Sequence, residues 1–267
     1  MKKDGLNIEY HENGEKKSEG HYKDGKKFGK WTEWFDSGTI RGRGNYKNGV
    51  EDGKWYFGGD LQEEITFKNG KRHGPYVWWN YDRKKYSEGI YKDGFQYGRW
   101  IYYDDEGRKI SEGNYNGKQN PNPDTYSHGG VCQSLEEGTW ITWYKNGKKE
   151  SEKNYTNGIL NGYCKYFYDN EVIKSDGHYI DGKKFGKWTE WFDSGTIRGR
   201  GNYKNGVEDG KWTYYDEDGK KTKEIVYDVN RIPIYDIVEI ITYHKDGSIT
   251  KETPSTFMGD DGEGYDF

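Results

Sequence analysis

The sequence contains no alanine, and its only leucines are Leu6, Leu61, Leu135 and Leu160. Alanine and leucine are the best helix formers, so a chain almost without them is not expected to build a helical core. No apolar run is long enough to predict a membrane-spanning helix. The first residues lack the apolar stretch of a secretory signal peptide, and these absences together predict a cytoplasmic protein.

Cysteine is also scarce, and the net charge is not positive. Cys132 and Cys164 are the only cysteines in 267 residues, and two thiols do not make a disulfide framework or a zinc site, so we expect both to be reduced bystanders. The formal net charge is −4, which is not the basic footprint of a nucleic-acid-binding protein. The six histidines show no metal-ligand spacing, so no metal or other cofactor is expected.

Aromatic residues and glycine are abundant instead. The chain has 26 Tyr, 11 Trp, 10 Phe and 39 Gly, although hydrophobic residues of all kinds make up only 30%. Disordered segments are poor in aromatics, whereas buried rings remove a large apolar area from water. Tyr, Trp, Phe and Thr favour strands and glycine favours tight turns, so the composition predicts an all-β protein.

The sequence is repetitive at two levels. Residues 24–55 read DGKKFGKWTEWFDSGTIRGRGNYKNGVEDGKW, and residues 181–212 are identical to them. Beneath this duplication lies a shorter unit, in which a glycine is followed by an aromatic residue two positions later and by another five positions later. The unit begins near residues 5, 29, 53, 74, 98, 138, 162, 186 and 210. A repeat of this kind predicts a repeat architecture, in which each copy forms the same structural unit.

Each unit contains two short segments that end in pairs such as Asp-Gly, Asn-Gly or Ser-Gly, which supply the positive φ angles of tight turns. We therefore predict an elongated, single-layer, twisted antiparallel meander of about nine two-stranded hairpins. Its structural anchors are Gly29, Trp31, Gly98, Trp100, Gly138, Trp140, Gly186, Trp188, Gly210 and Trp212.

The same pattern predicts a ladder of rings along one face of the sheet. One row comprises Trp31, Trp55, Tyr76 and Trp100, and the rings of the intervening strands that fill its gaps are Tyr22, Tyr46, Phe67 and Tyr91. The glycines expected to leave room for rings are Gly20, Gly44, Gly89, Gly177 and Gly201.

The pattern E-G-x-Y-x-x-G-x-x-x-G-x-W, best seen at residues 19–31 and 176–188, resembles the MORN repeat. The variant W-x-x-W/Y-Y/F-x-x-x-G is similar to that of bacterial MORN proteins and resembles the YwqK-type antitoxins. This resemblance implies a single-layer antiparallel sheet, a role in protein interaction, scaffolding or phospholipid contact, and no catalytic residues. The chain departs from the pattern at Gly58-Gly59, near residues 116–137 and after about residue 226.

These departures divide the chain into an array (1–225), C-terminal cap strands (226–252) and an acidic, disordered tail (253–267). The insertion at 116–137, with Pro121, Pro123, Gly129, Gly130 and Cys132, is interpreted either as a recognition loop or as a tolerated insertion. The Ile/Val-rich segment 224–250 is interpreted either as a cap or as a docking or dimerisation edge.

The aromatic residues are the candidates for function. Trp31 and Trp34 are three positions apart, so in a straight strand they point to opposite faces. The second row either helps to hold the sheet together or presents an aromatic stripe to a partner. The candidate binding residues are Trp34, Trp79, Tyr103, Trp143, Trp191 and Tyr215.

Catalysis is not expected. Glu33 and Glu190 could suggest a glycosidase pair, but other units carry Val77, Ile101 or Thr142 near the same place. We predict a non-enzymatic binding or scaffold protein with a protein partner, with antitoxin or immunity-like neutralisation as one form. The alternatives are a membrane-surface or phospholipid-binding module, against which the negative charge argues, and a carbohydrate- or choline-binding repeat.

Overall fold

The structure is a computed structural model, and it describes residues 4–59, 62–119, 126–127, 130–131, 134–228 and 237–253. Every regular element in these residues is a β-strand. The chain forms two compact units, one of residues 1–149 and 155–159 and the other of residues 150–154 and 160–267. The prediction of an all-β fold is confirmed.

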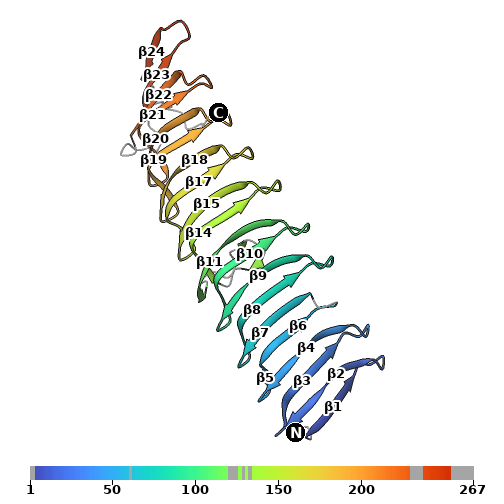
Figure 1. Cartoon of the computed structure of the whole chain (residues 1–267). Helices are drawn as coiled ribbons and strands as arrows, with labels where there is room; N and C mark the ends of the chain where they lie inside the picture. The colour runs from blue at the N-terminus through green and yellow to red at the C-terminus, as the bar shows by residue number, and fades with distance from the viewer. Residues whose placement is uncertain are drawn as a thin grey trace, which may run out of the picture. The chain divides into compact units, whose positions relative to one another are not determined.

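Twenty-two strands form one open antiparallel sheet, and two short strands pair with each other. Strands pair with those next to them in the chain, for example β2 with β3 and β3 with β4, so the predicted meander is confirmed; the run of colours in Figure 1 shows this order. In chain order the strands are β1 (Gly5–Tyr10), β2 (Lys16–Lys23), β3 (Lys26–Trp34), β4 (Ile40–Lys47), β5 (Val50–Glu51), β6 (Gly53–Phe57), β7 (Glu63–Lys68), β8 (Lys71–Trp79), β9 (Lys85–Lys92), β10 (Phe95–Tyr103), β11 (Lys109–Gln119), β12 (Tyr126–Ser127), β13 (Gly130–Val131), β14 (Ser134–Trp143), β15 (Lys149–Thr156), β16 (Ile159–Leu160), β17 (Gly162–Phe167), β18 (Ile173–Ile180), β19 (Lys183–Trp191), β20 (Ile197–Lys204), β21 (Val207–Tyr215), β22 (Lys221–Tyr227), β23 (Ile237–Tyr243) and β24 (Ile249–Glu252).

Two kinds of turn close each repeat. Between β2 and β3, Asp24 and Gly25 have φ angles of 50° and 71°, which is the conformation of a two-residue hairpin turn. Between β3 and β4 the turn is longer, and the N–H of Gly38 donates to the carbonyl of Phe35 at 3.0 Å. The Asp-Gly and Ser-Gly pairs of the sequence therefore lie where tight turns need them.

The anchor glycine of a unit lies at a β-bulge with the preceding strand, as the second unit shows. Gly29 has a φ of 71°, and the pairing of β2 with β3 steps from Gly20↔Trp31 to His21↔Phe28. The indole N–H of Trp31 donates to the carbonyl of His21 at 3.2 Å, beside this step. The equivalent bonds, 2.9–3.1 Å long, are made by Trp55, Trp100, Trp140, Trp188 and Trp212. The glycine and the tryptophan thus act together, because the ring bonds a carbonyl at the irregularity that the glycine creates.

The core is a ladder of rings, as predicted. Trp31 meets Tyr22 edge to face at 5.3 Å between ring centroids, and it meets Tyr46 at 5.9 Å. Tyr46 then contacts Trp55 at 4.9 Å. The six tryptophans of this ladder and its equivalents (Trp31, Trp55, Trp100, Trp140, Trp188 and Trp212) are 1–2% exposed. Edge-to-face pairs contribute about 0.5–1.5 kcal/mol each beyond the area that they bury.

A second set of glycines lies beneath the tryptophan rings. A Cβ on Gly20 would lie 2.2 Å from Cδ2 of Trp31. The same clash, at 2.1–2.3 Å, would occur at Gly44, Gly89, Gly113, Gly177 and Gly201. At one step of the ladder the ring is a tyrosine instead of a tryptophan, and the residue beneath it is not a glycine: Tyr76 pairs with Ile65. The expectation that these glycines leave room for rings is confirmed.

The segments that depart from the repeat are described in part. Strand β11 extends to Gln119 and β14 begins at Ser134, with the β12–β13 pair between them. Residues 120–125, 128–129 and 132–133 lie outside the described residues, and the expectations for Pro121, Pro123, Gly129 and Cys132 lie there too. In the predicted cap, Ile225 pairs with Ile240 and β23 pairs with β24. Residues 229–236 and the tail from residue 254 lie outside the described residues.

Candidate binding surface

The strands give the sheet two chemically different faces, because alternate side chains point to opposite sides. We call the side of the buried tryptophans (Trp31, Trp55, Trp100, Trp140, Trp188 and Trp212) the ring face. We call the opposite side, which carries Lys16, Glu19 and Trp34, the charged face. Each face is described separately for each of the two compact units.

The six predicted binding residues share one structural position. Each is the last residue of its strand, and the strands concerned are β3, β8, β10, β14, β19 and β21. All six side chains are half-buried, and none belongs to the exposed large apolar residues of the described chain. The residues Trp34, Trp79, Tyr103, Trp143, Trp191 and Tyr215 therefore do not form a bare apolar stripe.

At three of them, Trp34, Tyr103 and Trp143, the cover comes from an ion pair of the preceding strand. Lys85 lies 2.7 Å from Glu88, and the hydroxyl of Tyr103 donates to the same carboxylate at 2.6 Å. In the next repeat, Lys109 bonds Glu112 at 3.0 Å while its ammonium group lies 4.8 Å from the ring centroid of Trp143. A lysine, an acid three residues later and the ring of the following repeat thus form one recurring group.

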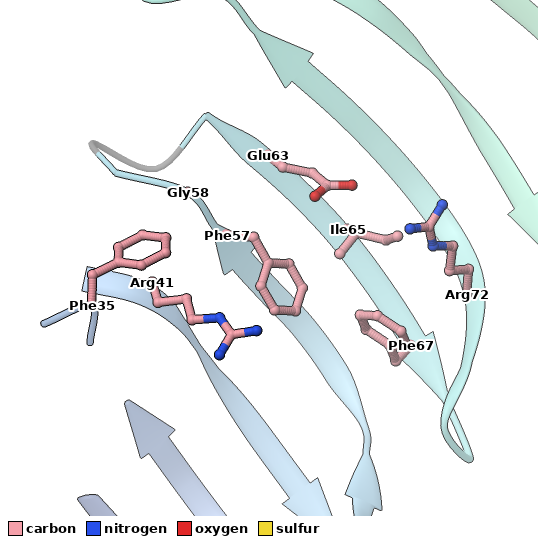
Figure 2. A pocket seen from close by; sticks show the side chains of 8 residues that line it. All are labelled: Phe35, Arg41, Phe57, Gly58, Glu63, Ile65, Phe67 and Arg72. Atoms are coloured by element: carbon pink, nitrogen blue, oxygen red, sulfur yellow. The ribbon is translucent and has the colours of Figure 1, made fainter. Parts of the chain in front are cut away.

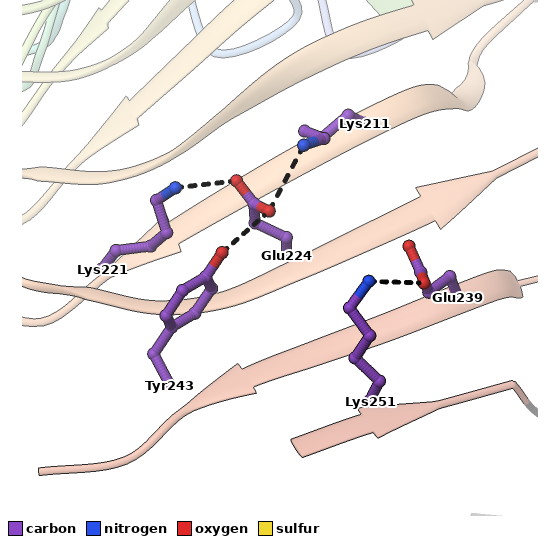
Figure 3. Close-up of polar contacts among 6 residues, drawn as sticks. All are labelled: Lys211, Lys221, Glu224, Glu239, Tyr243 and Lys251. Atoms are coloured by element: carbon purple, nitrogen blue, oxygen red, sulfur yellow. Dashed lines mark hydrogen bonds and ion pairs between the residues drawn. The ribbon is translucent and has the colours of Figure 1, made fainter. Parts of the chain in front are cut away.

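The same group occurs at the start and at the end of the described sheet. Lys16 bonds Glu19 at 2.7 Å and lies 5.8 Å from the Trp34 ring centroid. Figure 3 shows the C-terminal example, in which Glu224 accepts from Lys221 at 2.9 Å and from Tyr243 at 3.1 Å. Tyr243 lies in the segment interpreted as a cap, so that segment continues the chemistry of the repeat as well as its strands.

These contacts keep the acids ionised. Burial acts to raise the pKa of Glu88, but hydrogen bonds from Lys85 and Tyr103 outweigh it and lower that pKa below its ordinary value. The hydrogen bond from Lys221 likewise lowers the pKa of Glu224. Burial and the bond to Glu88 raise the pKa of Tyr103. At neutral pH the charged face therefore presents rings set among fixed charges of both signs.

The sequence argument missed three exposed rings of this face. Phe28 and Phe185 are each 45% exposed and Tyr97 is 43% exposed. Each comes directly before an anchor glycine, and lysine ammonium groups lie 5.6 Å from Phe28 and 4.8 Å from Tyr97. The available signal was the aromatic residue before the glycine, which alternates away from the ring face.

A hollow of about 310 Å³ borders one predicted residue, Trp143. Its lining also includes Arg108, Lys109 and Lys145. Arg108 is held by Asp104 at 2.7 Å and Lys109 by Glu112, so two of the three cations already have carboxylate partners.

The described part of the chain contains no group of three His, Cys, Asp or Glu residues placed to hold a metal ion. Nor do the described ranges include a helix with the length and apolar character needed to cross a membrane. Cys164 is fully buried at a position where most repeats have tryptophan, and burial raises the pKa of its thiol.

Comparisons with known proteins point to one family. A comparison with curated proteins gave no match. Among solved structures, one chain of the GtfA/B complex bound to UDP and GlcNAc is similar at 14% identity and a TM-score of 0.18, over 51% of this chain and 25% of that one. That score is too low to carry an argument, and the matched region spans a quarter of that chain's length. The profile described as the MORN repeat variant matches residues 3–24, 29–48, 136–157, 160–181, 186–205 and 208–228. With its glycine, tryptophan and hairpin periodicity, these six matches support identification of the chain as a MORN repeat protein.

Proposed function

We propose that this chain is a non-enzymatic binding protein that uses its charged face for protein–protein interaction. The observation that carries the proposal is the exposure of rings among ion pairs, with Phe28, Tyr97 and Phe185 each more than two-fifths exposed. Aromatic residues are enriched in protein interfaces and dominate their binding energy. The half-buried row that includes Trp34 and Trp143 would extend this surface.

A protein partner fits the electrostatics better than a lipid surface does. Acids such as Glu88 and Glu112 are ionised on the same face as the rings, and the chain has a net charge of −4. Anionic membranes attract polybasic segments and repel such a surface. The narrower form of the proposal is that the partner is a toxic domain that the chain neutralises, and it rests on the sequence resemblance alone.

Affinity capture from a lysate of the source organism, followed by mass spectrometry, tests the proposal. The variant to compare with wild type is Phe28→Ser combined with Phe185→Ser, since both side chains are exposed and neither belongs to the core. The matched control is Tyr81→Ser, because Tyr81 is 91% exposed in a turn. We expect a stoichiometric protein on wild type and on the control, and much less of it on the double variant.

The outcomes separate the candidate functions. A nuclease, protease or other toxic domain as the captured protein would support the narrower form. No captured protein, together with flotation of the chain on vesicles of anionic lipid at low salt, would replace the proposal with the membrane alternative. Equal capture by all three proteins would place the binding site elsewhere.

A further inference from the structure

A pocket on the ring face is formed where the repeat is broken. It has a volume of about 350 Å³ and lies at Gly58, with Phe57, Ile65 and Phe67 in its wall. Gly58-Gly59 stands where other repeats carry an aromatic pair such as Trp34-Phe35. The matches to the family profile stop at residue 48 and resume at residue 136. The apolar wall of the pocket therefore lies in a part of the chain that departs from the family pattern, whereas Arg41 lies within the matched range 29–48.

The apolar wall is fixed by packing. Phe57 stacks on Trp55 at 5.4 Å with an interplanar angle of 13°, and it meets Phe67 edge to face at 6.3 Å. Ile65 is 1% exposed. A wall of two rings and one branched aliphatic side chain suits an aromatic or aliphatic group of a ligand.

Two guanidinium groups flank this wall. Figure 2 shows Phe57, Ile65 and Phe67 between Arg41 on one side and Arg72 on the other. Arg41 is the extra residue of a β-bulge, because Glu33 pairs with Gly42 and Trp34 pairs with Ile40. The bulge re-aims the side chain, which is a common use of such irregularities next to binding sites.

The two arginines are not equivalent. The guanidinium group of Arg72 donates to the hydroxyl of Tyr91 at 3.3 Å and lies 5.3 Å from its ring centroid. Arg72 also offsets the carboxylate of Glu63, whose pKa is raised by burial and lowered by that arginine. The carbonyl of Arg41 accepts from the N–H of Gly58 at 2.9 Å, whereas its guanidinium group is exposed and has no hydrogen-bond or ion-pair partner within the described ranges. Among the described residues, the pocket therefore has one guanidinium group without a carboxylate partner beside its apolar wall.

We propose that this pocket binds a protein partner through a carboxylate side chain that lies next to an aromatic one, with the carboxylate on Arg41 and the ring against Phe57, Ile65 and Phe67. A single guanidinium group matches a carboxylate with two parallel hydrogen bonds. A phosphate dianion fits less well, because Glu63 lines the same pocket. The volume lies at the lower end of the roughly 300–1,000 Å³ range of ligand sites, which suits one or two side chains. This inference rests on the proposed function in requiring a protein partner, and it adds a contact on the ring face to the charged-face contact proposed above.

The duplicated sequence supplies a matched control. Arg198 is the equivalent of Arg41, within an identical run of residues, but Tyr214 and Tyr215 follow in place of Phe57 and Gly58. The two probes are the capped peptides Gly-Asp-Phe-Gly and Gly-Asn-Phe-Gly, which differ only in charge. Saturation-transfer NMR on the phenylalanine ring of each peptide measures binding to wild type, Arg41→Gln and Arg198→Gln.

We expect the acidic peptide to bind wild type and Arg198→Gln equally. Loss of the charged partner, in the amide peptide or in Arg41→Gln, should weaken binding about tenfold, the effect of a charge-assisted hydrogen bond. Equal transfer to both peptides, equal losses in both variants, or no transfer to the acidic peptide would overturn the inference. Because Arg41 is exposed, unchanged circular dichroism is expected to show that Arg41→Gln folds.

Affinity capture from lysate distinguishes an error in the pocket assignment from an error in the proposed function. A partner held equally by wild type and Arg41→Gln would overturn the pocket assignment and leave the proposed function standing. If wild type captures no partner, the proposed function fails and the pocket loses its assigned partner with it, whatever the peptides show.

Discussion

The substitution Gly44→Ala tests the packing of tryptophan rings on glycine. A Cβ at this position would lie 2.2 Å from Cδ2 of Trp55, so the ring has to move. Overpacking of this kind costs about 1–3 kcal/mol. The move also breaks the indole bond to the carbonyl of Asn45, now 2.9 Å long, which adds about 1 kcal/mol. We expect a loss of local stability of about 3 kcal/mol.

Native-state hydrogen exchange is the suitable assay, because stability in a repeat array varies from segment to segment and a thermal midpoint does not show which segment has changed. A loss of about 3 kcal/mol corresponds to roughly 100-fold faster exchange of the slow amides in residues 40–57. The control is Gly59→Ala, where a Cβ meets nothing within 4 Å. Surface changes of that kind stay within about 0.5 kcal/mol.

The chain itself suggests a compensating pair, since Ile65 and Tyr76 pair where other repeats have glycine and tryptophan. We expect Gly44→Ile combined with Trp55→Tyr to be less destabilised than the sum of the single changes, with a coupling of about 1–3 kcal/mol. The account of the core is refuted if Gly44→Ala exchanges like Gly59→Ala, or if the double variant shows strict additivity.

Four further predictions concern the indole bond, two acids and the buried thiol. Trp188→Phe leaves the carbonyl of His178 without the donor now at 3.1 Å, so exchange in its hairpin should speed up by the equivalent of about 1–2 kcal/mol, and an unchanged rate would contradict this role. The pKa of Glu224 is lowered, so its stabilisation is present above about pH 4.3 and is lost as the pH falls. Glu224→Gln should therefore lower the thermal midpoint at pH 7 and flatten its decline toward pH 3. The pKa of Glu63 is raised because burial favours the protonated carboxyl, so the stabilisation that this carboxyl contributes is lost as the pH rises. Glu63→Gln should therefore raise the thermal midpoint at pH 7. A lower midpoint would show that the interaction of Glu63 with Arg72 dominates. With the other cysteine replaced by serine, Cys164, which is 0% exposed, should react with an aromatic disulfide reagent only after denaturant is added; fast reaction in buffer would contradict its burial.

Much of the fold could be predicted because the same pattern of glycines, aromatic residues and turns recurs from repeat to repeat. The Gly29–Trp31 spacing and the Asp-Gly and Asn-Gly turns predict strand pairs in a meander, and the structure has them. The ring ladder was predictable as well, since alternation alone places Trp31 beside Tyr22 and Tyr46. The indole bond to a neighbouring carbonyl was not, because it depends on a register step that only the paired backbones show.

The candidate surface could be predicted only in part. Alternation placed Trp34 away from the ring face, but the sequence did not show that Lys16 covers it. Side-chain cover depends on which lysine reaches across two strands, and many lysines are available. Phe28 and Arg41 were missed because bulges on either side of β3 re-aim or expose residues that a regular alternation does not single out.

Hydroxyl-radical footprinting of the chain, free and with its captured partner, tests the central claim that the charged face binds a protein. Oxidation is followed at Phe28, Tyr97 and Phe185 on that face, with the 91% exposed Tyr81 as the reference. The account predicts protection of at least one of the three rings and none of Tyr81. Protection confined to Tyr81 and other turn residues, with the three rings oxidised as in the free chain, would contradict it.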